Sequence, residues 1–442
     1  KDFVTKELIF FSNYDNIRSI PSVMDGLKPS ERKILYCCFK RNLKSELKVA
    51  QLSGYVAEHS SYHHGEQSLA STITALAQDF VGSNNCNLLL PIGQFGSRYN
   101  GSKGAASPRY IFTALNPLTR QLFNESDDTL LLYNVDEGMK IEPVWYVPIL
   151  PTVLVNGSEG IGTGWSSSIP QYNPLDIAKN ILHKMNNEPL EEMMPWYRGY
   201  TGEIKEIAGG KNSNGAKVYS VTGRIKLSEE GRTVEITELP IHVWTRDYKT
   251  FLEKNHVDNK ENADAKKDFE VEDIKEYHTD NKLSFVVTLT ESSFEKVKTL
   301  SNEELIKMFR LSTSISTSNM VLFNSENKIK RYETVNDIID EFYKVRLDYY
   351  EKRKEYLLAK IGFTLSRNKS KRDFINLVLN NQIPFKSSKN KEEIFKILKA
   401  KQIPTLSELK RQYAKAFEIR STEIIVNYDE EKPIFDENDF DY

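Results

Sequence analysis

The sequence contains few cysteines and no long apolar run. Cys37, Cys38 and Cys86 are the only cysteines among 442 residues, and the two that are neighbours rarely bond to each other. This usage favours a reducing, intracellular compartment over a secreted disulfide framework. No run of about 18 apolar residues is present, so we expect no membrane-spanning helix. The first residues, KDFVTKELIF, lack both a signal-peptide pattern and a starting Met, and we expect a fragment boundary there.

The sequence also lacks the usual motifs of metal and nucleotide sites. The cysteines do not have the paired spacing of zinc ligands, and His63 and His64 are adjacent, so both cannot easily face one ion from a helix. No GxxxxGK[ST] phosphate loop occurs, because GSKGAASP has the wrong spacing and GGKNSNG lies between expected strands. GSEGIGTG is similar to a dinucleotide loop, but no βαβ unit surrounds it. We therefore expect no metal site and no nucleotide site within this chain.

Charge is distributed unevenly along the chain, although the net charge is only −2. Residues 1–120 carry 14 Lys and Arg against 9 Asp and Glu. The last sixteen residues, NYDEEKPIFDENDFDY, carry one Lys against seven acidic residues. A basic N-terminal third is compatible with a polyanion as partner, although such asymmetry also occurs on ordinary solvated surfaces.

The length of the chain favours two or three domains, of which the first is expected to be mostly helical. Within residues 25–43, Pro29 stands near a helix start, and the apolar residues Ile34, Leu35, Cys38 and Phe39 have helical spacing. Within residues 63–80, the spacing predicts a second helix that buries one face and exposes the other. We expect Leu69, Ile73, Leu76 and Phe80 on the buried face, and Gln67, Ser68 and Ser71 on the exposed face. Short strands after these helices favour a helix-turn-helix or winged-helix module.

The middle of the chain is expected to contain strands and then helices. Val153-Leu154-Val155 before a glycine cluster predicts a strand that enters a tight loop. Between residues 201 and 240, apolar and polar residues alternate, which predicts strands joined by polar turns. From there to about residue 330 we expect helical segments.

The last region is predicted to be a long helix of the coiled-coil type. No proline occurs from Val335 to Ile383, and Thr334 and Asp337 have the spacing of a capping box. Apolar residues follow an a/d heptad with one breach, Lys352, at Val335, Ile338, Phe342, Val345, Tyr349, Tyr356, Ala359 and Phe363. We expect a break or bend near Gly362. The alternative is a solvated helix packed on its own domain.

Basic residues and one tyrosine form the most suggestive set of polar side chains. Arg18, Lys28, Arg32 and Lys33 are followed by His63–His64 at a helix start, by Arg98, and by the pair Arg109–Tyr110. Lys, Arg and helix N-termini are what phosphate oxygens require. A phenol has a pKa of about 10 and is a weak nucleophile unaided, but an adjacent Arg stabilises negative charge that develops on a phosphate. From these residues alone, the favoured role of Tyr110 is structural.

Seven ordered motifs resemble one family. They are SIPSVMDGLKPSERKILY, ELKVAQL, YHHGEQSLA, LLLPIGQFGSR, AASPRYIFT, EPVWYVPILPTVLVNGSEGIGTGWSSSIP and EITELP. Together they resemble the breakage-reunion core of eukaryotic type IIA DNA topoisomerase, and the resemblance covers essentially the whole chain. Bacterial gyrase and topoisomerase IV A-type subunits share DGLKP, GxFGS and the RY pair. YHHGEQSLA and GSEGIGTGWS are more similar to the eukaryotic form.

The resemblance implies a role for each candidate site residue. Tyr110 is implied to be the nucleophile that attacks a DNA phosphate and becomes linked to the 5′ end, with Arg109 as its transition-state partner. The implied DNA-binding residues are Arg18, Lys28, Lys33, His63, His64 and Arg98. Ile161 lies between two glycines, and the residues alone leave open whether it is tucked beneath a tight turn or projects from the loop. The resemblance assigns it the role of a wedge that bends DNA.

The resemblance also implies an α+β multidomain fold and a larger enzyme. The expected domains are a winged-helix domain (1–125), an α/β tower domain (126–330), and a coiled-coil arm with a partial exit gate (331–442). Mg²⁺ and ATP are implied cofactors, held by Toprim and ATPase domains that this chain lacks, so the chain alone is not expected to relax DNA. Double-stranded DNA is the implied partner, the intact enzyme is expected to be a nuclear homodimer, and no membrane is implied. A non-catalytic DNA-bending scaffold of the same fold is the alternative from another functional class.

Overall fold

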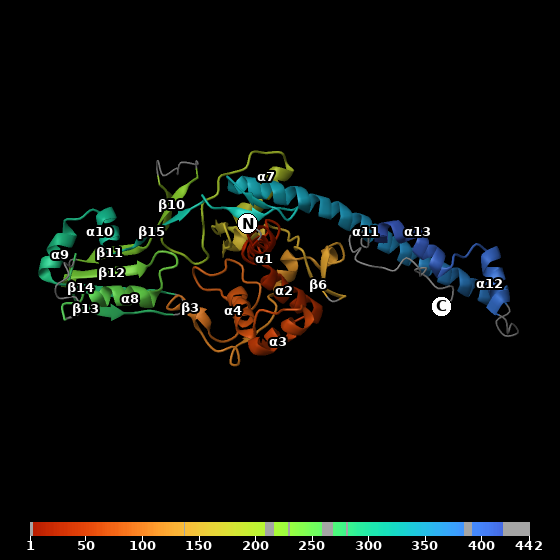
Figure 1. Ribbon diagram of the computed structural model, residues 1–442, viewed down its shortest axis with the longest axis horizontal. Helices are drawn as coiled ribbons and strands as arrows, with labels where there is room; N and C mark the ends of the chain where they lie inside the picture. Colours follow the sequence, from red (N-terminus) through yellow and green to blue (C-terminus); the bar gives the residue numbers. More distant parts are fainter. Residues whose placement is uncertain are drawn as a thin grey trace. The chain divides into compact units, whose positions relative to one another are not determined.

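The computed structural model describes residues 3–136, 138–207, 216–228, 230–258, 268–279, 282–383 and 391–418. The chain forms two compact units, of which one contains residues 1–124 and 134–345, and the other contains residues 125–133 and 346–442. Helices and strands both contribute (Figure 1), so the expected mixed α+β class is confirmed. The division into three domains stays a prediction. The predicted acidic C-terminal stretch and the segment GGKNSNG lie outside the described residues.

Helices dominate the first 80 residues. After a short π-helical turn (Val4–Leu8) come α1 (Ile9–Ser19), α2 (Pro29–Arg41), α3 (Val49–His59) and α4 (Glu66–Ala77). Pro29 begins α2 as predicted, and the Lys28 amide donates to Glu31 Oε2 at 2.7 Å. The predicted faces of α4 are confirmed, because Leu69, Ile73 and Leu76 are buried while Gln67, Ser68 and Ser71 are exposed. Phe80, however, lies beyond the end of this helix.

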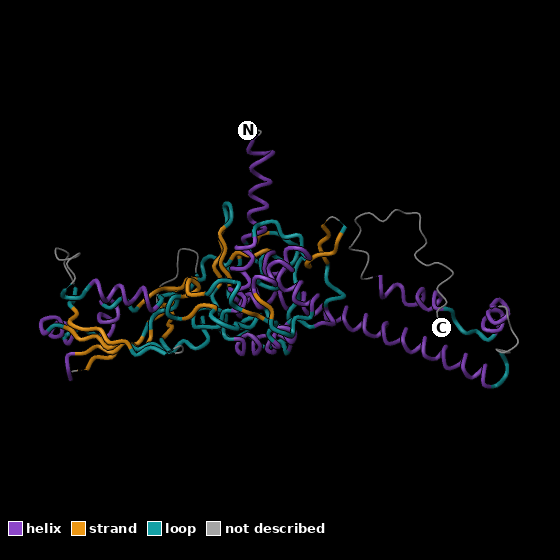
Figure 2. The backbone as a smooth tube through the Cα atoms, turned by 90° about the horizontal axis from the view of Figure 1, so that it is seen from below, coloured by secondary structure: helices purple, strands orange, loops and turns teal. Residues whose placement is uncertain are grey.

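The start of the chain extends away from the rest of the first unit. Figure 2 shows the helical segment formed by the π-helical turn and α1 projecting from the body of that unit. Its apolar side chains are correspondingly exposed, including Phe10 and Phe11. The end of α1 is anchored, because Asn16 within it and Ile20 directly after it are buried.

Two antiparallel sheets occupy the middle of the first unit. A three-stranded sheet has the order β15 (Ser312–Ser316), β10 (Val218–Thr222), β9 (Glu203–Glu206). A four-stranded sheet has the order β11 (Arg224–Ser228), β12 (Thr233–Glu238), β14 (Phe285–Leu289), β13 (Val271–Glu276). The core of the second sheet contains Ile236, Phe285 and Val287, and α8 (Thr245–Lys254), α9 (Glu291–Lys298) and α10 (Asn302–Met308) add apolar residues to it. The strands predicted between residues 201 and 240 are confirmed.

Short paired strands and single turns complete the first unit. The pairs are β1 (Leu47–Lys48) with β4 (Phe112–Thr113), β2 (Phe95–Ser97) with β3 (Gly101–Ala105), β7 (Ser158–Ile161) with β8 (Ser166–Ile169), and β16 (Val321–Phe323) with β17 (Ile329–Arg331). Strands β5 (Tyr133–Asp136) and β6 (Met139–Pro143) form a further two-stranded sheet. The remaining elements are α5 (Pro117–Leu122), η2 (Glu125–Asp127), α6 (Thr152–Asn156), α7 (Pro174–Met185) and η3 (Glu230–Arg232). Of these elements, η2 belongs to the second unit. Strand β5 begins at Tyr133, the last residue of the segment 125–133 of the second unit, and continues into the first unit.

Two predictions about the middle of the chain are wrong. Val153, Leu154 and Val155 form the short helix α6 instead of a strand, and all three are buried. A run of three apolar residues has no period that separates a helix turn from a strand, and here Pro151 starts the turn and Gly157, at φ 64°, ends it. The region from 240 to 330 is also not purely helical, because it contains β13 to β17.

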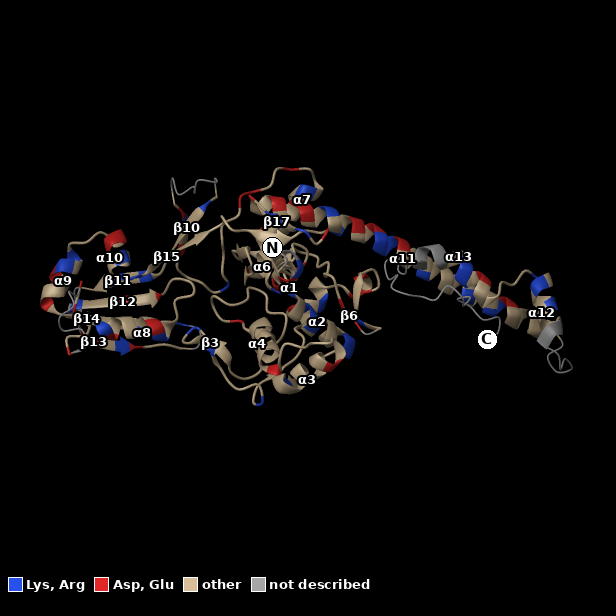
Figure 3. Ribbon diagram, in the orientation of Figure 1, with Lys and Arg blue, Asp and Glu red and all other residues tan. Residues whose placement is uncertain are grey.

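Helix α11 (Val335–Leu379) contains 45 residues and continues from the first unit into the second. The predicted capping box is confirmed, because the Thr334 amide donates to Asp337 Oδ2 (2.9 Å) and the Asp337 amide donates to Thr334 Oγ1 (3.2 Å). Its heptad positions are largely buried, and basic and acidic side chains are interspersed along its length (Figure 3). No described helix is both long enough and apolar enough to cross a bilayer.

The expected break near Gly362 is wrong, because α11 continues through this residue. The second unit also contains α12 (Lys391–Ala400) and α13 (Leu406–Glu418). A Cβ added at Gly362 would lie 2.9 Å from Cε1 of Tyr413 in α13. The glycine therefore allows a close approach of the Tyr413 ring.

Candidate nucleic-acid interface

Tyr110 lies on an exposed turn between two short strands. The turn follows β3 and precedes β4, and the Tyr110 amide donates to the carbonyl oxygen of Ser107 at 2.9 Å. The Tyr110 side chain is 75% exposed, and Arg109 is exposed as well. Within the described part of the chain, neither side chain makes a hydrogen bond or an ion pair. Both side chains are thus free to reach a ligand from solvent.

The backbone of this turn is held by the start of helix α3. The first amides of a helix have no partner inside the helix, and here two of them find partners in the turn. The Val49 amide donates to the carbonyl oxygen of Ile111 (3.0 Å), and the Ala50 amide donates to that of Pro108 (3.1 Å). Tyr110 therefore combines a backbone that is held by hydrogen bonds with a phenol that is exposed to solvent.

A second cluster forms where α1 meets the start of α4. Tyr14 Oη lies 2.7 Å from His64 Nε2, and the Arg18 guanidinium lies 5.8 Å from the centre of the Tyr14 ring. Desolvation lowers the pKa of His64, and the nearby charges of Arg18, His63 and Lys33 lower it further. The imidazole of His64 thus lies within electrostatic range of three other residues that were predicted to bind DNA.

Tyr14 was missed from the sequence. It lies four residues before Arg18 in α1, so a helical periodicity places both side chains on one face. That spacing was the available signal. The aromatic ring next to a guanidinium and an imidazole adds a flat surface to a cluster that otherwise offers only charge.

The two predicted lysines differ in how free they are. Lys28 is half-buried at the start of α2, where its amide takes part in capping. Lys33 Nζ donates to Glu142 Oε2 (2.8 Å) and to the carbonyl oxygen of Ser60, and its side chain is only 14% exposed. The charge of Lys33 is therefore already balanced by Glu142, so we expect a smaller contribution to phosphate binding than from the exposed Arg18.

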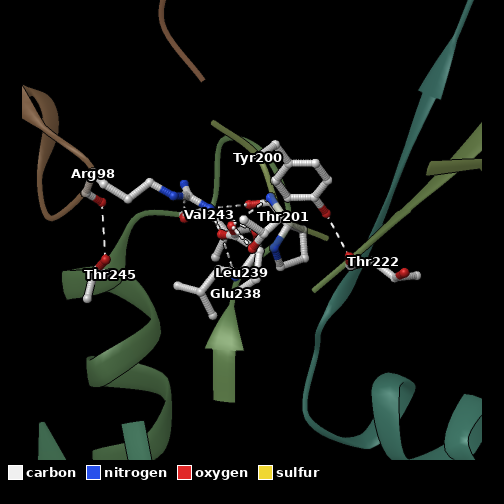
Figure 4. Close-up of polar contacts among 9 residues, drawn as sticks. Arg98, Tyr200, Thr201, Thr222, Glu238, Leu239, Val243 and Thr245 are labelled. Carbon is white, nitrogen blue, oxygen red and sulfur yellow. Dashed lines mark hydrogen bonds and ion pairs between the residues drawn. The ribbon is translucent and has the colours of Figure 1, made fainter. Parts of the chain in front are cut away.

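The surroundings of Arg98 contradict its prediction as a DNA-binding residue. Its guanidinium donates to the carbonyl oxygens of Val243 (2.8 Å), Leu239 (2.8 Å) and Pro240 (3.1 Å), and it pairs with Glu238 at 3.4 Å (Figure 4). Only 8% of the residue is exposed, and desolvation lowers its pKa while Glu238 opposes that change. A guanidinium with these partners is a structural group.

Arg32, which the sequence grouped with the same basic residues, is also structural. Its Nε donates to Asp25 Oδ2 at 2.7 Å and its Nη2 donates to Asp25 Oδ1 at 3.1 Å. Asp25 also accepts from the amide of Tyr146 at 2.8 Å. The pair thus connects the start of α2 with a segment more than 100 residues later in the chain.

Ile161 projects from the hairpin formed by β7 and β8. It is 84% exposed, so the buried alternative is excluded. Its neighbours explain why: a Cβ at Gly160 would overlap the carbonyl oxygen of Ser19, and a Cβ at Gly162 would overlap the side chain of Asn16. The hairpin therefore packs against the end of α1 through its two glycines. Because side chains alternate along a strand, the residue between them faces solvent.

Metal-binding geometry is not found in the described part of the chain. No group of three or more His, Cys, Asp or Glu side chains is arranged there to hold an ion.

Comparison with known proteins assigns the family. Residues 18–430 match the family model of the A-type subunit of DNA gyrase/topoisomerase IV. The chain belongs to this family.

Known members of the family extend the comparison. The chain is 49% identical to DNA topoisomerase 2 of Saccharomyces cerevisiae over 382 residues, which are 86% of this chain and 26% of that protein. It is 47% identical to DNA topoisomerase 2-beta of Gallus gallus over 397 residues, which are 90% of this chain and 23% of that protein. It thus spans about a quarter of the length of these relatives. The expected similarity to the eukaryotic enzymes is confirmed.

A solved structure of a family member is similar in fold. It is the DNA-binding, cleavage and re-ligation domain of Plasmodium falciparum topoisomerase II, with a TM-score of 0.83 and 45% identity. The match covers 92% of this chain and 53% of that structure.

Proposed function

We propose that this chain is the DNA cleavage and religation core of a eukaryotic type IIA topoisomerase, an ATP-dependent isomerase. The observation that carries the proposal is the exposed phenol of Tyr110 on a turn whose backbone is held by hydrogen bonds. The neighbouring Arg109 is also exposed and makes no ion pair within the described residues. Family membership supports it. Under this proposal, residues 1–125 form a winged-helix domain, 126–330 a tower domain, and 331–442 a coiled-coil arm with part of an exit gate.

In the proposed reaction, the oxygen of Tyr110 attacks a phosphorus atom of the DNA backbone. A bond from the phenol oxygen to phosphorus forms while the bond from phosphorus to the 3′ oxygen breaks. The phenol gives up its proton to solvent, and the leaving 3′ oxygen takes one up. One phosphodiester replaces another, so that religation needs no external energy. Arg109 stabilises the negative charge that develops on the phosphate.

The intact enzyme is proposed to pass one duplex through a double-strand break in another. Two subunits are needed, since each Tyr110 cuts one strand, and we propose a homodimer in the nucleus. Mg²⁺ and ATP are proposed to bind Toprim and ATPase domains outside this chain. A bacterial A-type subunit and a DNA-bending scaffold are the alternatives, and the scaffold is distinguished by whether Tyr110 forms a covalent adduct.

The proposed phosphate contacts give a salt-dependent prediction. Replacing Arg18 with Ala is expected to weaken binding equally on all sequences and to reduce the slope of log K against log salt by about one, because one phosphate contact is lost. Fluorescence anisotropy on two unrelated duplexes between low and moderate salt measures both quantities. Lys354→Ala, on an exposed position of α11, is the control and leaves the slope unchanged. A sequence-dependent loss with an unchanged slope would mean that Arg18 contacts bases. Lys28, Lys33, His63 and His64 are proposed to bind phosphates in the same way.

The exposed isoleucine gives a prediction about DNA shape. An apolar wedge between base steps costs a few kcal/mol of unstacking, which the contacts made by bent DNA offset. We expect Ile161→Ala to reduce bending of a short duplex, measured by end-to-end FRET, while the thermal midpoint changes by less than about 1 °C, because the side chain is exposed. Leu175→Ala removes an aliphatic side chain of the same unit that is also largely exposed, at 76%, and serves as control. Normal bending in the Ile161 variant would reject the wedge.

A further inference from the structure

The buried guanidinium of Arg98 joins two parts of the first unit that are distant in the sequence. Arg98 follows strand β2, whereas the carbonyl groups that it binds follow strand β12, about 140 residues later. Three carbonyl oxygens and one carboxylate surround the guanidinium. A planar fork with five donors suits such a set, and a lysine ammonium does not reproduce it. The contact thus specifies a geometry as well as a charge balance.

Glu238 extends this cluster to a third segment. Its Oε1 accepts from the amide of Leu239 (3.0 Å) and faces Arg98. Its Oε2 accepts from the amide (3.1 Å) and the hydroxyl (2.9 Å) of Thr201 (Figure 4). Both carboxylate oxygens of Glu238 are therefore hydrogen-bonded. The segment before β9, the end of β12 and the β2–β3 hairpin meet at this pair.

The backbone of the same hairpin is bonded to the start of helix α8. The Thr245 hydroxyl donates to the carbonyl oxygen of Arg98 (3.1 Å), and the Arg246 amide donates to that of Tyr99 (3.0 Å). A Cβ at Gly101 would overlap the ring of Trp244. The β2–β3 hairpin is thus held next to the four-stranded sheet and α8 by the side chain of Arg98 and by its own main chain.

This hairpin leads directly into the turn that carries Tyr110. Strand β3 ends at Ala105, the Ala106 amide donates to the carbonyl oxygen of Gln94 (2.9 Å), and Ser107 accepts from the Tyr110 amide. Helix α3 fixes one side of the turn, as described above, and the hairpin fixes the side from which the chain arrives. A shift of the hairpin therefore moves the first residues of the turn.

We infer that Arg98, supported by Glu238, is a positioning residue that holds the Tyr110 turn in the geometry for DNA cleavage. The inference rests on the proposed function. A misplacement of about 1 Å costs up to about 100-fold in rate when the reacting groups must be aligned. Release of the hairpin therefore lowers cleavage more than it lowers binding, because the exposed residues near α1 and α4 remain in place.

The test uses Arg98→Lys and Glu238→Gln in the full-length protein. Arg98→Lys keeps the charge but loses the fork, and Glu238→Gln keeps the volume but places an amide donor against Arg98 or Thr201. We expect each variant to bind a duplex of about 40 base pairs within about threefold of wild type and to lower the single-turnover cleavage rate by about 10- to 100-fold. The cleavage rate of the double variant should be only slightly lower than that of the slower single variant, because both substitutions break the same contact.

The matched control is Tyr248→Phe. The Tyr248 hydroxyl is buried in the core beside the four-stranded sheet and donates to the carbonyl oxygen of Phe309 at 2.8 Å. This variant lowers the thermal midpoint through a lost buried hydrogen bond without touching the hairpin. Its cleavage rate should equal that of wild type at a temperature well below the midpoint. An equal fall in cleavage for Tyr248→Phe would show a general effect of stability and would overturn the inference.

The outcomes separate the inference from the proposed function. If the wild-type protein cleaves DNA, and the folded Arg98 and Glu238 variants cleave it at a rate within about twofold of wild type, the inference is overturned and the proposed function is not. A wild-type protein that forms no covalent adduct overturns the proposed function, and the inference with it. If Arg98→Lys does not fold, Glu238→Gln, which changes no volume, decides between normal and lowered cleavage.

Discussion

Tyr110→Phe is expected to abolish covalent DNA cleavage in the full-length protein and to leave DNA affinity within a few-fold of wild type. The substitution removes one hydroxyl from a side chain that is 75% exposed and has no hydrogen-bond partner in the described part of the chain. No packing is lost, so the fold is expected to persist. The oxygen that we propose attacks the phosphate is absent, so no phosphodiester with the protein is expected to form. Denaturing gels of labelled duplex measure the adduct, and anisotropy measures the affinity.

The control for this prediction is Tyr277→Phe. Tyr277 is also an exposed tyrosine of the first unit, at 61%, and its loss of a hydroxyl should leave cleavage unchanged. Cleavage near the wild-type level in Tyr110→Phe would mean that another residue attacks the phosphate. Loss of DNA binding together with cleavage would instead give Tyr110 a binding role.

Arg109→Ala is expected to lower the single-turnover cleavage rate by about 10²- to 10³-fold. One donor that stabilises developing negative charge contributes about 3–4 kcal/mol to the transition state. Arg109 is exposed and makes no ion pair within the described residues, so its charge is available to a phosphate. Rapid quench of labelled duplex measures the rate at saturating protein.

Arg109→Lys separates charge from geometry. It retains the positive charge but not the bidentate donation of the guanidinium, so an intermediate rate is expected. An unchanged rate in Arg109→Ala would assign Arg109 to the surface instead of to the reaction.

Local patterns in the sequence were sufficient for several elements. The start of α2 at Pro29, the buried face of α4 and the cap formed by Thr334 and Asp337 each depend on residues within one or two turns. The same holds for the alternating strands near residue 220. Where the nearest neighbours in sequence decide the structure, a single sequence contains the information.

Long-range packing decided the rest. In the sequence, Arg98 resembles any other surface cation. Its burial depends on a partner, Glu238, that lies 140 residues away in the sequence. Ile161 was ambiguous until the packing of Gly160 and Gly162 against α1 showed which side of the hairpin faces solvent. The glycine at 362 likewise required knowledge of Tyr413.

The candidate nucleophile shows a different limit. The residues around Tyr110 do not by themselves distinguish it from a structural tyrosine, and only the order of seven motifs pointed to a role in catalysis. The structure adds that its backbone is fixed by α3 while its phenol is free. The family comparison alone provided neither the fixed backbone nor the exposed phenol.

Peptide mapping of a trapped covalent complex tests the central claim most directly. The full-length protein is mixed with a duplex in the presence of Mg²⁺, denatured rapidly, and digested with protease and nuclease before mass spectrometry. The account predicts one peptide that contains Tyr110 with a 5′-phosphonucleotide on its phenol oxygen. An adduct on any other residue, or no adduct when cleaved DNA is present, would contradict it.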